Sequence, residues 1–339
     1  MKQTNYYLFD FLDFSPDLNG EDVLWRACEP TNIEVVDMDV LVTIPFQKQI
    51  CSNDIRPDMS VERKEYKLRM RAYGERILRV SIGFGLPEMP DSPMLKLSHE
   101  LEVFPLEVIR STNEWLVIDA KANKRASFNF RRPEIDHWSD LLPGPEETLD
   151  VTFYPDGKKE VKTSAYDQFF PARHDAMTLA FVEKIGAADR ATMSFHADQD
   201  EVFVGAGERF TKLDLAGKTV QLKNQDGQGV NNRRTYKNIP FYISNKMYGV
   251  FLHTSAFSKF SFADHSSRSV QMLVEQPLID VFLIGGNTIE EITRQYRQLT
   301  GFPSMPPLWS FGTWMSRMTY FSADEVNDIC DRLRREDYP

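Results

Sequence analysis

Asp226 is the residue whose type and setting most suggest chemistry. It lies in the run Asn-Gln-Asp-Gly at 224–227, where Asp-Gly is a turn signal after a strand and puts a carboxylate on a loop. The polar stretch 224–234 has no apolar period, so burying it would leave backbone groups unpaired. An exposed carboxylate can accept charge-assisted hydrogen bonds from a ligand, or it can cap its own turn. Spacing alone favours the capping role.

Three other short motifs accompany this loop. Gly-Ala-Gly-Glu-Arg-Phe occupies 205–210, Tyr-Lys-Asn-Ile-Pro-Phe-Tyr occupies 236–242, and Pro-Pro-Leu-Trp-Ser-Phe-Gly-Thr-Trp occupies 306–314. The two glycines of the first motif allow a bend or a close backbone approach. Its Glu208 and Arg209 are expected to form a structural ion pair. The alternation of the last motif predicts a short buried strand over 308–314.

Together, in this order and spacing, the four motifs resemble glycoside hydrolase family 31, the α-glucosidase and α-xylosidase family. The residues of the motifs at 205–210 and 236–242 are most similar to those of its bacterial α-xylosidase branch. The resemblance covers about a third of the chain and is loose before Glu201. It implies a retaining glycosidase that cleaves a terminal α-linked sugar through a glycosyl-aspartate intermediate.

The resemblance also implies site residues. In the family, a loop Asp in the position of Asp226 meets the sugar nearest the scissile bond. Trp314, Met318 and Tyr320 lie where a barrel places its first βα loop, which carries substrate contacts in barrels. The family often has an aromatic residue at the place of Met318, so Tyr320 or Phe321 is an alternative source of that ring. For Met318, Tyr320 and Phe321, packing is an equal alternative.

The catalytic carboxylates are expected outside this chain. Retaining hydrolysis uses two carboxyl groups about 5–5.5 Å apart, and in family 31 both are Asp residues on later barrel strands. No stretch here matches either motif, so we predict no catalytic residue in this chain and no activity of the 339-residue chain by itself. The acids Asp198, Asp200 and Glu201 are interpreted as strand-edge surface.

Composition excludes several other classes. The formal net charge is −10 and no basic block is long, which is atypical of nucleic-acid binding. The six His residues lack metal-ligand spacing, and the glycine pattern at 205–207 lacks the rest of a nucleotide-binding motif. We therefore predict no metal, no cofactor and no nucleic-acid or membrane partner. The expected partner is an oligosaccharide or glycoside substrate, and a homo-oligomer of the full-length enzyme stays open.

Three distant cysteines and a start without the pattern of a signal peptide favour the cytoplasm.

The elements that would position these motifs are mostly strands. Residues 1–60 look irregular, with acid clusters such as 37–39, and from Glu65 onward the period becomes two. Many short strands follow up to 285, with a hairpin at the turn 155–157 and an exposed insertion at 131–147. We therefore predict a mainly β fold, a large antiparallel β-sandwich similar to galactose mutarotase, over 1–285.

The period then changes to that of helices. An apolar stripe predicts a connecting helix within 286–302, started by Thr288 with Glu291 in capping-box spacing and ended by Gly301. Ser322 with Glu325 predicts a second helix. By the family resemblance, 303–339 is the first β/α unit of a truncated (β/α)8 barrel. The chain is thus expected to be the N-terminal part of a longer enzyme.

Two other functions stay open at this point. One is a stand-alone carbohydrate-binding β-sandwich module. The other is an epimerase-like sugar enzyme, because the sandwich of the family resembles the mutarotase fold. A mutarotase needs a placed His pair with a Glu base, and the spacing of His174, His196, His253 and His265 singles out no such pair.

Overall fold

Antiparallel strands make up most of the first three hundred residues. The computed structural model describes residues 22–50, 62–83, 89–130, 149–163, 178–184, 187–227, 233–312, 314 and 316–338. The chain divides into two units, Met1–Gly301 and Phe302–Pro339. The expected insertion at 131–147 lies outside the described residues. Each unit is described by itself below.

The larger sheet of the first unit has fifteen strands in the described part of the chain, and every pairing is antiparallel. Its order is β14-β16-β17-β20-β5-β4-β3-β1-β12-β13-β19-β18-β15, with β2 beside β3 and β6 beside β4. These strands are β1 (Val23–Ala27), β2 (Asn32–Val36), β3 (Asp39–Ile50), β4 (Arg63–Tyr73), β5 (Ile77–Gly83), β6 (Val103–Phe104), β12 (Leu179–Lys184), β13 (Ala187–His196), β14 (Phe203–Gly205), β15 (Lys218–Leu222), β16 (Phe241–Ser244), β17 (Tyr248–Leu252), β18 (Ser258–Phe262), β19 (Ser269–Val274) and β20 (Leu278–Gly285).

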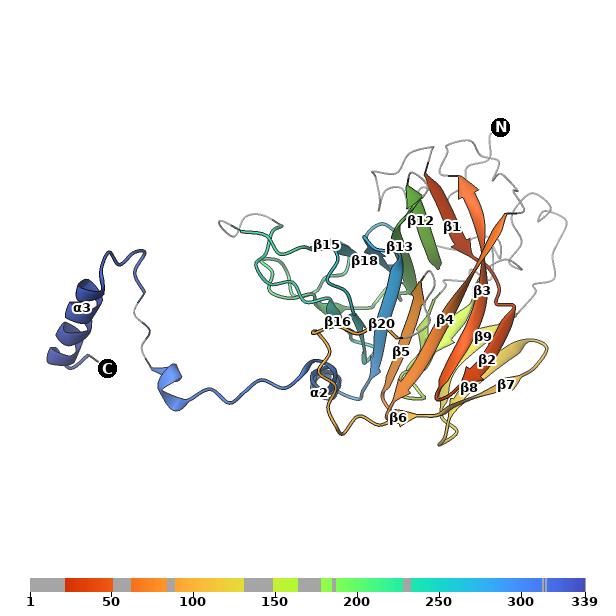
Figure 1. The fold of residues 1–339 in the computed structure, drawn as a ribbon, viewed down its shortest axis with the longest axis horizontal. Coiled ribbons are helices and arrows are strands. Elements are labelled where there is room, and N and C mark those ends of the chain that lie inside the picture. Colours follow the sequence, from red (N-terminus) through yellow and green to blue (C-terminus); the bar gives the residue numbers. More distant parts are fainter. Residues whose placement is uncertain are drawn as a thin grey trace. The chain divides into compact units, whose positions relative to one another are not determined.

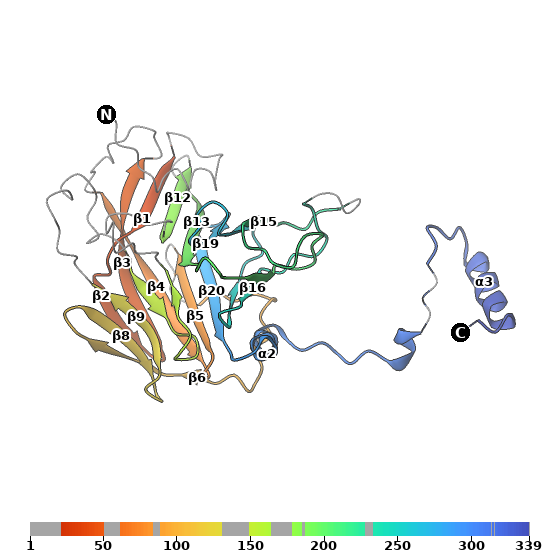
Figure 2. The same ribbon diagram turned by 180° about the vertical axis from the view of Figure 1, so that it is seen from behind.

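A second sheet has five strands in the order β11-β10-β9-β8-β7. They are β7 (Leu106–Arg110), β8 (Glu114–Asp119), β9 (Lys124–Asn129), β10 (Val151–Phe153) and β11 (Val161–Lys162). This sheet lies beside β2 and β3, as Figures 1 and 2 show. The predicted hairpin at 155–157 is confirmed, because β10 and β11 pair across that turn.

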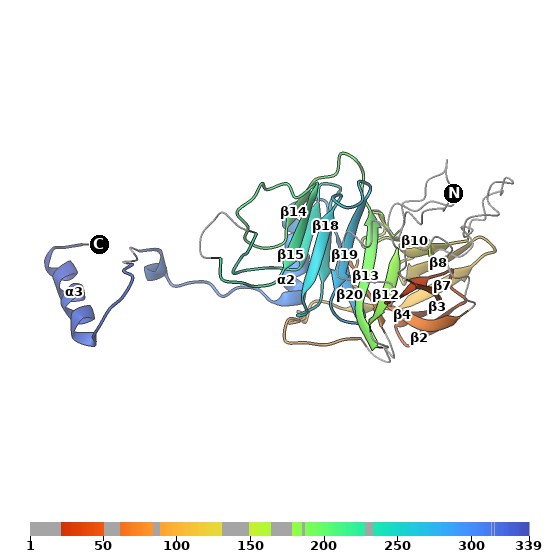
Figure 3. The ribbon, with the colours of Figure 1, turned by 90° about the horizontal axis from the view of Figure 1, so that it is seen from above.

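The two ends of the large sheet pack face to face, which gives the sandwich its core. The ring of Tyr242 on β16 lies 5.5 Å from Phe260 and 5.1 Å from Phe262 on β18, centroid to centroid. Seen from above, β13, β19 and β18 follow one another as their pairing requires (Figure 3). The predicted mainly β, antiparallel fold is confirmed.

The expectation of an irregular start is wrong for residues 22–50, which form β1 to β3. On β3 the alternate residues Val40, Val42 and Ile44 are fully buried, as a half-buried strand requires. The acid cluster that suggested irregular structure is the β2–β3 turn. Asp39 is accommodated there because Arg71 donates to both of its carboxylate oxygens, at 2.7 and 2.9 Å.

Helix α2 (Ile289–Thr300) completes the first unit. As predicted, the Thr288 side chain accepts a hydrogen bond from the Glu291 N–H, and Gly301 ends the helix with its N–H on the Arg297 carbonyl. The buried face of α2 packs on β17 and β20, where Ile292 is fully buried beside Phe251 and Phe282.

The second unit contains η3 (Leu308–Phe311) and α3 (Ala323–Arg335). The Ser322 cap accepts from the Glu325 N–H, as predicted. The expected strand over 308–314 is wrong: its first four residues form a 3-10 turn. A β-strand needs a neighbour for its N–H and C=O groups, and the described residues pair no strand with this segment. Trp309 and Phe311, which the predicted buried strand contains, are 74% and 73% exposed.

Candidate functional site

Three of the four sequence motifs meet in one cluster of loops beside β14 and β16. The glycine motif lies against the backbone of the segment 237–241. Ala206 N–H donates to the Phe241 carbonyl at 2.8 Å, and Glu208 N–H donates to the Lys237 carbonyl at 3.0 Å. Gly207 has a φ of +89°, and a Cβ there would lie 2.8 Å from the Ile239 nitrogen. Glycine is therefore required both for the conformation and for the approach.

Arg209 ties the glycine motif to its neighbours. Its Nε donates to the Ala206 carbonyl at 3.2 Å, and its Nη2 donates to the Gln221 carbonyl at 2.9 Å and to Asn238 Oδ1. The expected ion pair with Glu208 is wrong, because Glu208 lies 3.4 Å from Lys237 Nζ instead. Burial without a carboxylate partner lowers the pKa of Arg209 to about 10.

The polar motif at 224–227 is held by the same cluster. Asn224 Oδ1 accepts from the Asn238 backbone N–H at 2.9 Å and from its side-chain amide at 2.8 Å. Gln225 N–H donates to the Thr235 carbonyl at 3.0 Å, and the buried Thr235 hydroxyl donates to the Glu208 carbonyl. The base of the loop is thus fixed on both sides, although the loop itself is polar.

Asp226 lies at the exposed end of this loop, as the sequence predicts. The Tyr236 hydroxyl donates to Asp226 Oδ1 at 2.6 Å, and the Tyr236 ring is 61% exposed. A carboxylate and a phenol are therefore presented together on a fixed base, so both can contact a ligand rich in hydroxyl groups. The substrate-binding role of Asp226 stays a prediction.

The other predicted site residues belong to the second unit. Trp314 is 72% exposed, its Nε1 donates to the Ser310 carbonyl at 2.8 Å, and its ring lies 6.5 Å from that of Trp309. Met318 is fully exposed, and the Arg317 guanidinium lies 5.7 Å from the centre of the Tyr320 ring. The substrate-binding roles of Trp314, Met318 and Tyr320 stay predictions.

Glu201 is not the surface acid that the sequence suggested. It is 5% exposed, its Oε1 accepts from the Tyr248 hydroxyl at 2.7 Å and from Ser244, and its Oε2 accepts from the Asp198 N–H at 3.0 Å. These donors include side chains at the end of β16 and the start of β17, and they satisfy a carboxylate that lies just before β14. Glu201 is therefore a structural residue of the sheet edge.

A second polar cluster is buried under the loop 89–95. His253 lies 2.6 Å from Ser92 Oγ through Nε2 and 2.6 Å from Asp280 Oδ2 through Nδ1, which is the order of a serine-hydrolase triad. Asp280 also accepts two bonds from Arg79, at 3.0 and 2.7 Å. Although burial raises the pKa of Asp280, the bonds from His253 and Arg79 hold it below the ordinary value.

The backbone N–H groups that could form an oxyanion site beside such a triad already donate hydrogen bonds within the loop. Ser92 N–H bonds the Asp91 side chain, Met94 N–H bonds Ser92 Oγ, and Leu95 N–H bonds the Ser92 carbonyl. An oxyanion site requires backbone N–H groups aimed at a ligand. The cluster therefore serves to fasten the loop to β20.

The comparisons with known proteins agree with this architecture. Residues 67–260 match the family model of the glycosyl hydrolase 31 N-terminal galactose mutarotase-like domain, and residues 303–339 match the TIM-barrel domain of glycosyl hydrolases family 31. The first match alone spans more than half of the chain. The chain belongs to glycoside hydrolase family 31.

Particular relatives include two α-xylosidases. The chain is 39% identical over 142 residues to α-xylosidase XylQ of Lactiplantibacillus pentosus, covering 41% of this chain and 18% of that protein. It is 34% identical over 141 residues to an α-xylosidase of Emericella nidulans, again covering 41% of this chain and 18% of that protein. The matched region is thus less than a fifth of either relative.

Solved structures share the fold. A family 31 dextranase of Flavobacterium johnsoniae, complexed with glucose, superposes with a TM-score of 0.63 at 17% identity, over 92% of this chain and 33% of that chain. A family 31 α-xylosidase from a soil metagenome, complexed with xylose, superposes with a TM-score of 0.63 at 16% identity, over 91% of this chain and 40% of that chain.

Sequence reasoning missed the partners of the predicted residues. Tyr236 was part of a motif, but its contact with Asp226 joins positions ten apart across a loop. Arg209 was assigned to its neighbour Glu208, whereas its acceptors lie in its own motif, at Ala206, and on two other segments, at Gln221 and Asn238. The one available signal was that the three motifs lie close together in the sequence, within 205–242.

Proposed function

We propose that this chain acts as the N-terminal part of a retaining α-glycosidase, most similar to an α-xylosidase, which hydrolyses terminal α-linked sugars of an oligosaccharide or glycoside. Membership of family 31 and the similarity to two α-xylosidases support this proposal. The matched part is a small share of those relatives, so the catalytic Asp pair belongs to barrel strands beyond the matched residues.

The role of this chain is to support the barrel and to supply one substrate-binding loop. The observation that carries the proposal is the interlocked base of that loop, which fixes Asp226 beside Tyr236. A fixed carboxylate loses little entropy when it accepts two sugar hydroxyls, and these charge-assisted bonds are stronger than neutral ones. Trp314, Met318 and Tyr320 are proposed as further substrate-binding residues, because they lie where a barrel places its first βα loop.

The test uses the chain joined to its remaining barrel, with p-nitrophenyl α-xyloside and α-glucoside as substrates. Asp226→Ala should lower kcat/KM by roughly one to three decades, since it removes one or two bonds of about 1.5–3 kcal/mol each. Its melting temperature should barely change, because the residue is exposed. The 339-residue chain by itself should turn over neither substrate.

Asp264→Ala is the matched control. Asp264 is also an exposed acid on a loop, and its Oδ2 accepts a hydroxyl bond from Thr219 at 2.7 Å, close to the 2.6 Å of the Tyr236–Asp226 bond. It should leave kcat/KM unchanged. If Asp226→Ala lowers the melting temperature sharply and leaves the kinetics intact, Asp226 is a structural turn residue. Turnover by the chain alone would show that a catalytic pair had been overlooked.

A cytoplasmic location completes the proposal. Cys28 and Cys330 are both thiols rather than disulfide partners, which suits a reducing compartment. In the part of the chain that the structure describes, no helix is long and apolar enough to cross a membrane.

A further inference from the structure

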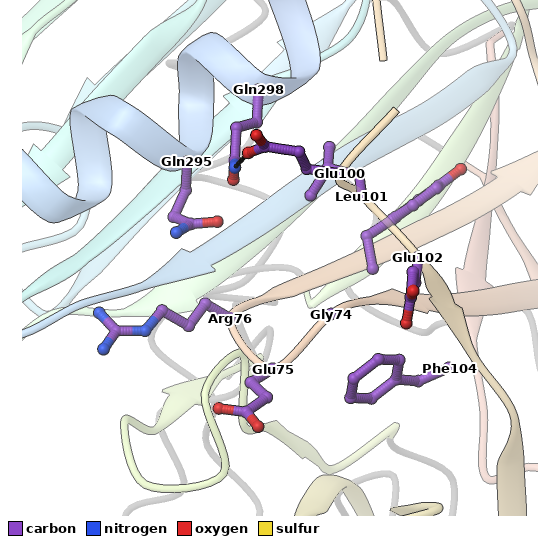
Figure 4. Close-up of a pocket in the computed structure, with 10 residues that line it drawn as sticks. Gly74, Glu75, Arg76, Glu100, Leu101, Glu102, Phe104, Gln295 and Gln298 are labelled. Carbon is purple, nitrogen blue, oxygen red and sulfur yellow. Dashed lines mark hydrogen bonds between the residues drawn. The ribbon is translucent and has the colours of Figure 1, made fainter. Parts of the chain in front are cut away.

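A surface hollow of about 320 Å³ lies on the first unit, away from the loop cluster of Asp226. Three segments form it: the β4–β5 turn at 74–76, the segment 100–104 that ends with β6, and the last turns of α2. Figure 4 shows Gln295 and Gln298 descending from the helix, with the Gln298 amide beside Glu100 and with Arg76, Glu75 and Phe104 below them. Pockets of this size suit a small molecule.

The walls of the hollow are fixed before any ligand binds. The fully buried Arg125 donates to the carbonyls of Gly74 and Glu75 and so holds the β4–β5 turn from beneath. On the opposite wall, the last carbonyl groups of α2, which have no partner within the helix, accept hydrogen bonds from a neighbouring segment. Ser98 N–H donates to the Gln298 carbonyl at 2.8 Å, and Lys96 N–H donates to that of Leu299 at 2.7 Å. A pre-formed site loses less entropy on binding.

Not all of the acceptors that line the hollow are used in hydrogen bonds. Glu75 is paired with Lys121, and Arg76 is paired with Glu291. The exposed Glu102 carboxylate lies within electrostatic reach of Lys121, but among the described residues it accepts no side-chain hydrogen bond. A free acceptor therefore stands at the rim of a fixed concavity.

The side chain of Gln298 is a second, independent indication that the hollow binds a ligand. Its side chain is 9% exposed, its amide N–H points to Glu100 Oε2 at 3.5 Å, and its Oε1 is shielded from solvent without any hydrogen-bond partner. Exchanging the amide atoms would set an oxygen against the Glu100 carboxylate, so the orientation is determined. Buried acceptors are normally satisfied, and an orphan at a pocket wall indicates a donor that is absent.

The mixture of groups decides the chemical class of the ligand. Glu102 and Gln298 offer acceptors, whereas Arg76 and Gln295 offer N–H donors. An ammonium group only donates, but each hydroxyl of a sugar both donates and accepts. The half-buried ring of Phe104 adds an apolar surface. A metal ion does not fit, because the described residues hold no group of three or more metal-ligating side chains.

We propose that this hollow is a second, non-catalytic carbohydrate site, which holds one unit of a neutral saccharide and so keeps a longer substrate on the protein. The choice of saccharide over other polyols rests on the proposed function. Hydroxyl groups of the sugar donate to Glu102 and, after a small rotation of the amide, to Gln298 Oε1. The amide of Gln295 donates to a sugar oxygen.

Titration of the 339-residue chain with D-xylose, D-glucose and isomaltose tests the site, by amide NMR shifts on deuterated protein. At least one of these sugars should shift the amides of 74–76, 100–104 and 295–298. Glu102→Gln keeps the shape and removes the charge, and it should weaken binding about tenfold. Gln295→Ala should also weaken binding. Glu107→Gln, an exposed acid on β7, should bind as the unchanged chain does.

The outcomes separate this site from the proposed glycosidase function. Shifts confined to 224–238 would overturn the second site and leave the glycosidase proposal intact. Binding that is equal in the Glu102→Gln and Glu107→Gln variants, or no shift with any of the three sugars, would overturn it as well. Putrescine is the competing probe. If it binds in a Glu102-dependent way and the sugars do not, the hollow is a cation site and the saccharide assignment is wrong.

Discussion

Replacement of Gly207 by alanine tests whether the close backbone approach builds the loop cluster. Gly207 has a φ of +89°, and a Cβ there would overlap the Lys237 carbonyl and lie 3.0 Å from the Asn238 Cα. Gly217 is the matched position. Its φ is +71°, but a Cβ added there meets nothing within 4 Å. The two Ala variants therefore share the backbone strain and differ in the steric contact.

The magnitudes follow from these two contributions. Alanine in the left-handed region costs about 1–2 kcal/mol, and the lower entropy of the unfolded chain returns about 0.4–1 kcal/mol. Gly217→Ala should therefore lose at most about 1.6 kcal/mol. Gly207→Ala carries the same contributions plus about 1–3 kcal/mol for overpacking against backbone that cannot rotate away. The expected difference between the variants is about 1–3 kcal/mol.

Urea unfolding at 25 °C measures this difference, with near-ultraviolet circular dichroism as the signal. The midpoint should fall further in Gly207→Ala than in Gly217→Ala at an unchanged slope, which shows that stability rather than compactness has changed. Equal losses in the two variants would refute the reasoning, because the steric contact would then contribute nothing. A loss confined to Gly217→Ala would contradict it as well.

Two further predictions concern buried charge and the second unit. Asp280→Asn should lower the free energy of unfolding at pH 7 by about 3–5 kcal/mol, because Arg79 keeps a buried charge without its partner. Since its pKa in the folded state lies below the ordinary 3.8, Asp280 stabilises the fold above about pH 4 and loses that effect as the pH falls through the folded value. Urea unfolding from pH 7 to pH 3 should thus show a shallower pH dependence in Asp280→Asn, and equal slopes would contradict the assignment. Hydrogen exchange should be fast from 303 onward, because α3 has thirteen residues, none of them buried; protection in α3 equal to that of β20 would show that the second unit is firmly packed.

The local sequence determined much of the first unit. Alternation of apolar and polar residues predicted most strands after residue 65, and the caps Thr288 and Ser322 placed the starts of both described α-helices, because capping depends on residues three apart. The exposure of Asp226 also followed from composition. These features depend on contacts that are short in sequence, so the sequence shows them directly.

Pairing across long separations could not be predicted in this way. The acid cluster at 37–39 suggested irregular structure until Arg71 supplied its partner from another strand. Glu201 looked like a surface acid until Tyr248 and Ser244 were seen to satisfy it. In both cases burial of a charge depends on donors that only the folded chain brings together.

The segment 308–311 is a case in which the local pattern predicted an element that the tertiary structure does not form. Its alternating pattern is that of a strand, but strand formation requires a neighbour, and a 3-10 turn satisfies backbone groups locally. The motifs by themselves indicated the family and the residues of interest. Only the tertiary structure decided that Arg209 and Asn238 bind those motifs into one cluster, and that Gln298 is left with an unpaired acceptor at the wall of a hollow, because hydrogen-bond partners are fixed by position in space and not by position in the chain.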